Sequence, residues 1–290
     1  MAHSPSELGA PLWEAAGDRT HRIQEAARRI RINALTMGEQ QGQGYIAQAL
    51  GISDVLAALY ADQLRLRPED PDWPERDRFL MSIGHYAIAL YAALAEAGTI
   101  STDELLTYAA DDSRLPMSAM SSYTPGVEIS GGSLGHGLTV ATGIGIALRR
   151  KKNPARVYTM LSDGELDEGS TWEAALAAAH HGLDNTTAIV DVNALQADGP
   201  TPGVLRTEPV EDKWRAFGWR ALRVDGNDVD ALVSALDELR EHRGSPSVLI
   251  CDTRVGRGVP FLEEREKAHF MRVEEHEWQL AREHVREVRP

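Results

Sequence analysis

The sequence predicts an α/β fold, in which helices cover both faces of a parallel β-sheet. Throughout the second half of the chain, short apolar runs typical of strands alternate with longer amphipathic runs typical of helices. Such alternation indicates βαβ units, whose right-handed crossovers place helices on both faces of the sheet. No repeat or long linker interrupts the pattern. We therefore expect one α/β domain over residues 19–290, with residues 1–18 as an N-terminal arm.

The predicted elements follow one another in a clear order. Apolar residues recur at helical spacing from Ile23 to Met37, and Ser53 is a candidate N-cap for a second helix that runs to Tyr60. The rest of the first half is predicted to contain a polar loop over 67–76, a strand over 79–82, a turn over 83–85, a helix over 86–97 and a capping box of Ser101 and Glu104. The second half is predicted to contain strands over 156–161, 186–192, 220–224 and 247–252, and helices over 169–182, 210–217 and 228–242.

Composition and charge exclude several classes of partner. Of the 290 residues, 42% are apolar and 26% are charged, which is ordinary for a globular protein. The net charge of −14 would repel nucleic acids and anionic membrane surfaces. The longest apolar stretches, 87–95 and 139–148, are shorter than a bilayer span, so we expect a soluble protein. Cys251 is the only cysteine and has apolar neighbours, which predicts a buried thiol and fits a reducing cytoplasm.

Polar residues follow two predicted strands at their carboxyl ends, where ligands bind in open parallel sheets. Asp163 comes after the strand that ends at Leu161, and Asn193 follows the next strand. The two residues are thirty positions apart, about the length of one βαβ unit, so they are expected side by side. A carboxylate and an amide oxygen, with the backbone carbonyl of Leu195, form a site suited to Mg²⁺.

Gly164 would let a phosphate group approach the backbone, and the helix start that follows would offer free N–H groups to it. Taken singly, Asp163 and Gly164 are also consistent with a simple turn, and Asn193 with a cap. Their combined spacing favours the binding site over those alternatives.

Two blocks of this edge resemble the thiamine-diphosphate fingerprint of transketolases. They are Ser162-Asp163-Gly164-Glu165 and Asp191-Val192-Asn193. The resemblance extends over most of the chain, in the same order, through Ser82-Ile83-Gly84-His85, Thr124-Pro125-Gly126-Val127-Glu128, Gly131-Gly132-Ser133-Leu134-Gly135, Gly256-Arg257-Gly258-Val259-Pro260-Phe261 and His269. Several independent blocks in the right order make this a specific resemblance.

The resemblance implies a role for each matching residue. Mg²⁺ would be held by Asp163, Asn193 and the carbonyl of Leu195. The diphosphate would be contacted by His85, Gly164 and His269, with Glu165 in the same cofactor-binding block and with His85 and His269 also in catalytic roles. Gly132 and Leu134 would line the cofactor rings, while Glu168 and Glu173, which composition alone marks as surface acids, would lie at a subunit interface.

The sequence departs from the transketolase pattern on the substrate side. Tyr45 stands where the family has a histidine, and Ser118 stands in place of another. Neither side chain can act as an imidazole acid or base near neutral pH. His136 stands where the family commonly has glutamine, and Ser162 replaces the first glycine of the fingerprint. We therefore expect ketol transfer on a sugar or sugar derivative other than the usual pentose phosphates.

The resemblance covers only the N-terminal third to half of complete transketolases. In that family, the glutamate that activates the cofactor lies in a later domain, so a second chain with the pyrimidine-binding and C-terminal domains is expected. Two copies of each chain (α2β2) would close the assembly symmetrically. Two other possibilities remain open: a subunit of another thiamine enzyme, similar to deoxyxylulose-phosphate synthase or a 2-oxoacid dehydrogenase, and a non-catalytic assembly or regulatory paralogue.

Overall fold

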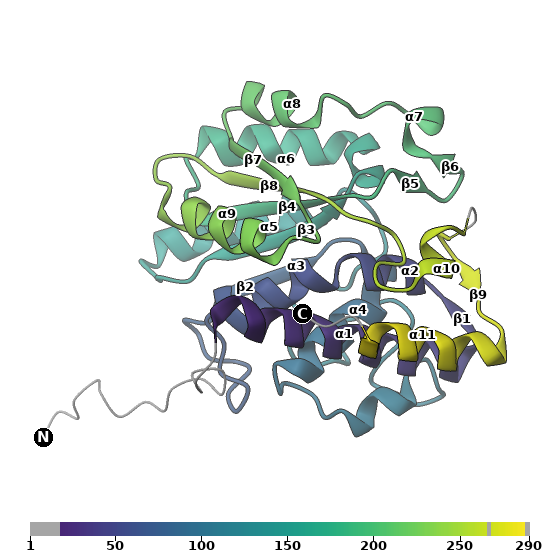
Figure 1. Ribbon diagram of the computed structural model, residues 1–290. Helices are drawn as coiled ribbons and strands as arrows, with labels where there is room; N and C mark the ends of the chain where they lie inside the picture. The colour runs from purple at the N-terminus through teal and green to yellow at the C-terminus, as the bar shows by residue number, and fades with distance from the viewer. Residues whose placement is uncertain (1–17, 266–267, 288–290) are drawn as a thin grey trace, which may run out of the picture.

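A five-stranded parallel sheet forms the centre of the protein (Figure 1). The computed structural model describes residues 18–265 and 268–287. The strand order is β2-β3-β4-β8-β7, with β2 Arg78–Met81, β3 Val157–Ser162, β4 Thr186–Val192, β7 Arg220–Asp225 and β8 Ser247–Asp252. All four neighbouring pairs are parallel. The predicted α/β class and its strands are confirmed, whereas the predicted arm falls almost entirely on residues 1–17, outside the described residues.

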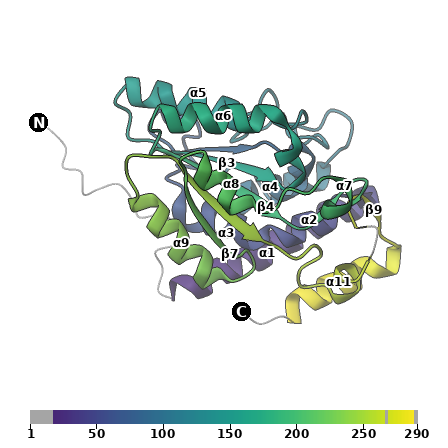
Figure 2. The ribbon, with the colours of Figure 1, turned by 90° about the horizontal axis from the view of Figure 1, so that it is seen from above.

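Helices cover both faces of the sheet, as Figure 2 shows from above. One face packs against α1 Arg19–Gln41, α2 Ile46–Gly51, α3 Ser53–Ala58, α4 Ala87–Glu96 and α9 Val229–Glu241, and the other against α5 Gly137–Arg150, α6 Gly169–His180 and α8 Val210–Ala216. Alternate residues of one strand serve the two faces: Met160 of β3 belongs to the first core and Leu161 to the second. This period of two explains why the strands read as continuous apolar runs.

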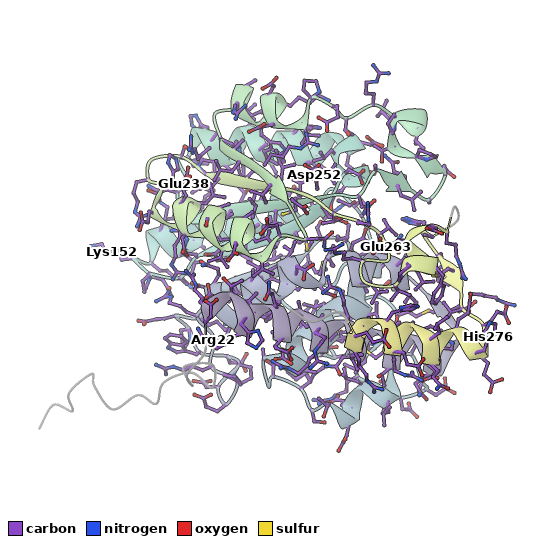
Figure 3. All side chains as sticks on the ribbon, viewed as in Figure 1. Arg22, Lys152, Glu238, Asp252, Glu263 and His276 are labelled. Carbon is purple, nitrogen blue, oxygen red and sulfur yellow. The ribbon has the colours of Figure 1, made fainter. Side chains whose placement is uncertain are left out.

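Shorter elements complete the chain. They are β1 Gln43–Gly44, the π-helix Leu59–Gln63, 3₁₀ turns at Gly84–Tyr86, Asp103–Thr107 and Gly164–Asp167, β5 Leu195–Gln196, β6 Gly199–Pro200, α7 Thr201–Val204, α10 Pro260–Glu263, β9 Met271–Arg272 and α11 Glu275–Glu287. Polar side chains such as Lys152 and His276 lie at the outer edges of the molecule (Figure 3). Within the described residues, no helix is both long and apolar enough to cross a membrane.

Two capping predictions differ from the structure. Ser53 does not cap α3, because α2 runs almost directly into it and the Ser53 hydroxyl donates instead to the carbonyl of Ala49, at 2.7 Å. The capping box at Ser101 is only half formed. The Glu104 N–H donates to the Ser101 hydroxyl at 3.2 Å, but the Glu104 carboxylate pairs with Arg114 at 2.8 Å, and the segment is a 3₁₀ turn.

Candidate functional site

The carboxyl ends of β3 and β4 meet, because the register pairs Ser162 with Asp191. Just beyond them, the Asp163 carboxylate accepts hydrogen bonds from the N–H of Gly164 at 2.9 Å, the N–H of Ala194 at 3.1 Å and the hydroxyl of Thr201 at 2.7 Å. The residue is 1% exposed, and burial raises its pKa. The structure therefore joins Asp163 to the loop that contains Asn193, as the thirty-residue spacing predicts.

The Asn193 amide is fixed in orientation by its neighbours. Its Nδ2 donates to the carboxylate of Asp191 at 2.6 Å and to the hydroxyl of Tyr86 at 3.0 Å, while its Oδ1 accepts from the N–H of Leu195 at 3.0 Å. Asp191 is fully buried, and burial raises its pKa to about 6. It also accepts from Thr253 at 2.5 Å and from Tyr86 at 3.2 Å. These supporting residues were not predicted, although Asp191 lies inside the quoted block.

Three aromatic rings form a wall beside this edge. The ring centroids of Tyr45 and His85 are 4.6 Å apart, those of Tyr45 and His269 are 5.4 Å apart, and those of the two histidines are 5.7 Å apart. Burial, together with the charge of His269, lowers the pKa of His85 to about 4, and burial lowers the pKa of His269. Both imidazoles are therefore neutral at pH 7, and each can donate one N–H and accept one hydrogen bond.

Segments far apart in sequence build the aromatic wall. β1 pairs with β9 in antiparallel register, which brings Tyr45, directly after β1, next to the residues before β9. Gln48 Nε2 lies 3.3 Å from His269 Nδ1 and so holds that ring. Phe270 packs against Tyr45 at 5.1 Å and remains 45% exposed. Sequence reasoning missed Phe270 and Gln48, because the pairing that makes them neighbours involves only two residues on each strand.

The loop over residues 131–137 lies against the 3₁₀ turn that carries His85. A Cβ on Gly84 would come within 2.3 Å of the carbonyl carbon of Gly131, so the two backbones touch. The contact is held by hydrogen bonds from Gly131 N–H to Ala119 O and from Ala119 N–H to Gly84 O. Gly132 has φ +142°, and a Cβ there would meet nothing within 4 Å. Leu134 packs against the apolar core. The predicted ring-lining residues thus lie beside His85.

Glu165 is fully buried below this loop. Its Oε1 accepts from the hydroxyl of Ser82 and from the N–H of Gly135, and its Oε2 has no hydrogen-bond partner within the described residues. Burial raises its pKa to about 7. Gly164 lies beside Gln196, whose side chain would be 3.3 Å from a Cβ placed on the glycine.

The remaining predicted residues lie at the surface. Ser118 is exposed, and no hydrogen bond of its side chain to another described residue is present. His136 is exposed at the start of α5, with its Nδ1 3.1 Å from the carbonyl oxygen of Leu134. Glu168 and Glu173 are exposed at the beginning of α6. Their exposure leaves all four available to substrate or to another chain.

A cavity of about 490 Å³ lies elsewhere, between α1, α10 and α11. Its lining contains Arg31, which pairs with Asp54 at 2.5 Å, and Glu263, which pairs with Arg254 at 3.0 Å. None of the predicted site residues lines it. Since much of its charge is already paired within the chain, we assign it no ligand.

Comparison with known proteins identifies relatives over nearly the whole chain. Residues 22–286 match the family described as transketolase, thiamine diphosphate binding domain. A transketolase family protein of Sinorhizobium fredii is 63% identical over 88% of this chain and 92% of its own length. The 6-deoxy-6-sulfo-D-fructose transketolase subunit SqwG of a Clostridium species is 40% identical over 86% of this chain and 92% of its own length. One of the apulose-4-phosphate transketolase subunits, from Actinobacillus succinogenes, is 41% identical over 84% of this chain and 88% of its own length.

A solved structure has the same architecture. The transketolase of Campylobacter jejuni superposes with a TM-score of 0.85 and 28% identity over 93% of this chain. The match spans only 43% of that transketolase. The chain is therefore similar in length to relatives named as subunits and much shorter than this transketolase.

Proposed function

Because the chain belongs to the family of transketolase thiamine-diphosphate-binding domains, we propose that it catalyses ketol transfer together with a second subunit. The reaction would move a two-carbon ketol unit from a ketose to an aldose. The observation that carries the proposal is the shared edge at which Asp163, Asn193 and the aromatic wall lie beside loop 131–137. Bound thiamine diphosphate would supply the carbon nucleophile, and this chain would bind, orient and shield it.

Mg²⁺ would be held by the Asp163 carboxylate, the Asn193 amide oxygen and the Leu195 carbonyl, together with diphosphate oxygens. This donor set fits a small hard cation, since all its members are oxygens. Among the described residues, no group of three or more His, Cys, Asp or Glu is placed to hold a metal. An amide and a backbone carbonyl are outside that class, so the proposed site does not need such a group. The orientation of Asn193, with Nδ2 fixed on Asp191, leaves Oδ1 as the amide's ligand atom.

His85 and His269 would donate hydrogen bonds to the diphosphate. Their lowered pKa values keep them neutral at pH 7, so each would contribute a directed N–H rather than a mobile charge. Gly132 and Leu134 would line the rings, and Gly164 would let the phosphate approach the backbone. Apolar and aromatic surroundings would exclude water at the point where the reactive carbon lies.

The substrate side supports a sugar other than the usual pentose phosphates. Tyr45 is part of the aromatic wall and cannot exchange a proton near neutral pH as an imidazole does. Ser118 and His136 are exposed and could contact a sugar that enters from solvent or from the partner chain. Relatives named for sulfofructose and for apulose 4-phosphate support a non-standard sugar. Neither name identifies the substrate of this chain.

The partner would carry the pyrimidine-binding and C-terminal domains, including the glutamate that activates the cofactor. The names of the two subunit relatives support a divided enzyme, and α2β2 is the simplest closed assembly. Glu168 and Glu173, exposed at the start of α6, would face another subunit.

Reconstitution of the pair tests this function. The chain would be mixed with the product of the neighbouring reading frame, thiamine diphosphate and Mg²⁺, and assayed with a panel of ketose donors and aldose acceptors. We expect two-carbon transfer by the mixture, none by either chain alone, and none with Asp163→Ala. Cofactor binding with decarboxylation of 2-oxoacids or formation of deoxyxylulose phosphate would favour another thiamine enzyme. Absence of cofactor binding would favour the non-catalytic paralogue.

A further inference from the structure

Glu165 connects the two halves of the proposed cofactor site through a short chain of buried hydrogen bonds. Its Oε1 accepts from the N–H of Gly135 at 2.7 Å and from the hydroxyl of Ser82. The same Ser82 oxygen accepts from the N–H of Gly137 at 2.9 Å. One carboxylate and one hydroxyl thus hold two amides of loop 131–137.

Both acceptors are themselves anchored to β3. The N–H of Glu165 donates to the hydroxyl of Ser162 at 3.2 Å, and its carbonyl accepts from Thr171 at 3.1 Å. The N–H of Ser82 donates to the carbonyl of Met160 at 3.1 Å. Ser162, which replaces a family glycine, therefore helps to fix the backbone of Glu165. The loop is bound to the rigid centre of the sheet rather than to another loop.

Glycines allow the loop to approach this closely. Gly135 has φ +79°, and a Cβ there would come within 2.3 Å of the hydroxyl of Ser170. A Cβ on Gly137 would come within 2.3 Å of Ser82 Oγ. The backbone can therefore reach the carboxylate and hydroxyl only where side chains are absent. Since Glu165 and Ser82 are almost fully buried, little water competes for these hydrogen bonds.

We propose that Glu165 is a positioning residue, which acts through Ser82 to fix loop 131–137 against the segment that carries Asp163 and Gly164. This differs from the direct cofactor contact that the motif implies, because its hydrogen-bonded oxygen faces Ser82 and Gly135. The inference rests on the proposed function in one respect, namely that loop 131–137 lines the cofactor. The contact itself depends only on the described hydrogen bonds.

Amide hydrogen exchange tests the contact without cofactor. In Glu165→Ala, the amides of Gly135 and Gly137 are expected to exchange about tenfold faster, because their acceptor is lost or displaced. Glu165→Gln keeps an oxygen acceptor in the same place and should remain within about threefold of the wild type. Exchange in β4 and α9 should not change in either variant. Glu241→Ala, on the exposed side of α9, is the surface control.

Unchanged exchange of loop 131–137 in Glu165→Ala would overturn the contact. An equal rise in β4 and α9 would also overturn it, because Glu165 would then stabilise the whole chain rather than the loop. Ser82→Ala, which removes the hydroxyl and leaves the carboxylate, should release Gly137 more than Gly135. This second variant keeps the inference testable if Glu165→Ala folds poorly.

Cofactor affinity tests the positioning role. Isothermal titration with thiamine diphosphate and Mg²⁺ should show about tenfold weaker binding by Glu165→Ala and substantial rescue by Glu165→Gln. Wild-type affinity in Glu165→Ala, despite faster exchange of the loop, would overturn the role. If the wild-type chain with its partner binds no cofactor, the proposed function fails and the positioning role fails with it. The exchange result would still decide the hydrogen-bonded contact separately.

Discussion

The two sides of the proposed site differ in how completely the chain itself builds them. At the carboxyl ends of β3 and β4, the Asp163 carboxylate and the Asn193 amide each make several hydrogen bonds to neighbouring groups. On the substrate side, Ser118 and His136 are exposed, and Phe270 presents almost half of its surface to solvent. The difference teaches that the diphosphate side is preorganised within this chain, whereas the substrate side is left for other groups to complete.

The largest effect is expected at the preorganised side. Asp163→Ala removes the only carboxylate of the proposed metal site, so affinity for thiamine diphosphate with Mg²⁺ should fall by about 100-fold or more. It also leaves the Gly164 and Ala194 amides without their acceptor, which should lower the free energy of unfolding by about 1–3 kcal/mol. Titration calorimetry and urea unfolding measure the two effects. Asp212→Ala, whose side chain is 71% exposed, is the matched control. Retained affinity in Asp163→Ala would contradict the metal assignment.

The aromatic wall should show an intermediate effect. His85→Ala removes one neutral N–H donor to the diphosphate, so cofactor affinity should fall by about tenfold, with partial recovery in His85→Gln. His276→Ala, at the exposed start of α11, should leave binding unchanged. If His85→Ala binds like the wild type, the imidazole does not contact the diphosphate.

The pH dependence of stability should report the burial of His85. Its pKa is about 4 in the folded chain, against 6.5 for an unperturbed histidine. Between those values the unfolded chain binds more protons than the folded chain, so stability rises with pH and is lost as pH falls towards 4. The contribution should be on the order of 2 kcal/mol, since His85 is partly exposed. Urea unfolding from pH 4 to 7 should give a smaller rise in His85→Gln, and an identical rise would show that His85 is not the cause.

The smallest effect on cofactor affinity is expected at the open side. Tyr45→His and Phe270→Ala should each change the affinity for thiamine diphosphate by less than about threefold, while altering KM for the sugar in the reconstituted pair. Calorimetry and steady-state kinetics on the same samples separate the two readouts. A large loss of cofactor affinity in Phe270→Ala would place this ring on the cofactor side and weaken the distinction between the two regions.

Much of the sheet could be predicted because its strands are long, apolar and separated by amphipathic helices. The site edge followed from this pattern, since the spacing of Asp163 and Asn193 is local to one βαβ unit. The pairing of β1 with β9 could not be predicted in the same way. It joins two residues near position 43 to two near position 272, and so short a pair leaves no periodic signal. The positions of Gln48 and Phe270 therefore emerged only from the structure.

Caps and buried partners were also beyond the sequence pattern. Ser53 matches the N-cap preference, but the preceding helix already supplies the carbonyls that its hydroxyl and the first amides of α3 use. α5 was recognised only as an apolar stretch, because three glycines within it reduce its helical propensity. Glu165 belonged to a recognised motif, yet its contacts with Ser82 and Gly135 depend on side-chain direction, which spacing alone does not give.

Isothermal titration of thiamine diphosphate with Mg²⁺, into this chain alone and into its mixture with the product of the neighbouring reading frame, tests the central claim most directly. The division into a preorganised diphosphate side and an open substrate side predicts that binding appears or sharpens in the mixture and disappears with Asp163→Ala. Binding by neither sample would contradict the claim and would mean that the edge is a relic. Equally tight binding with and without the partner would contradict the need for a second chain at the cofactor site.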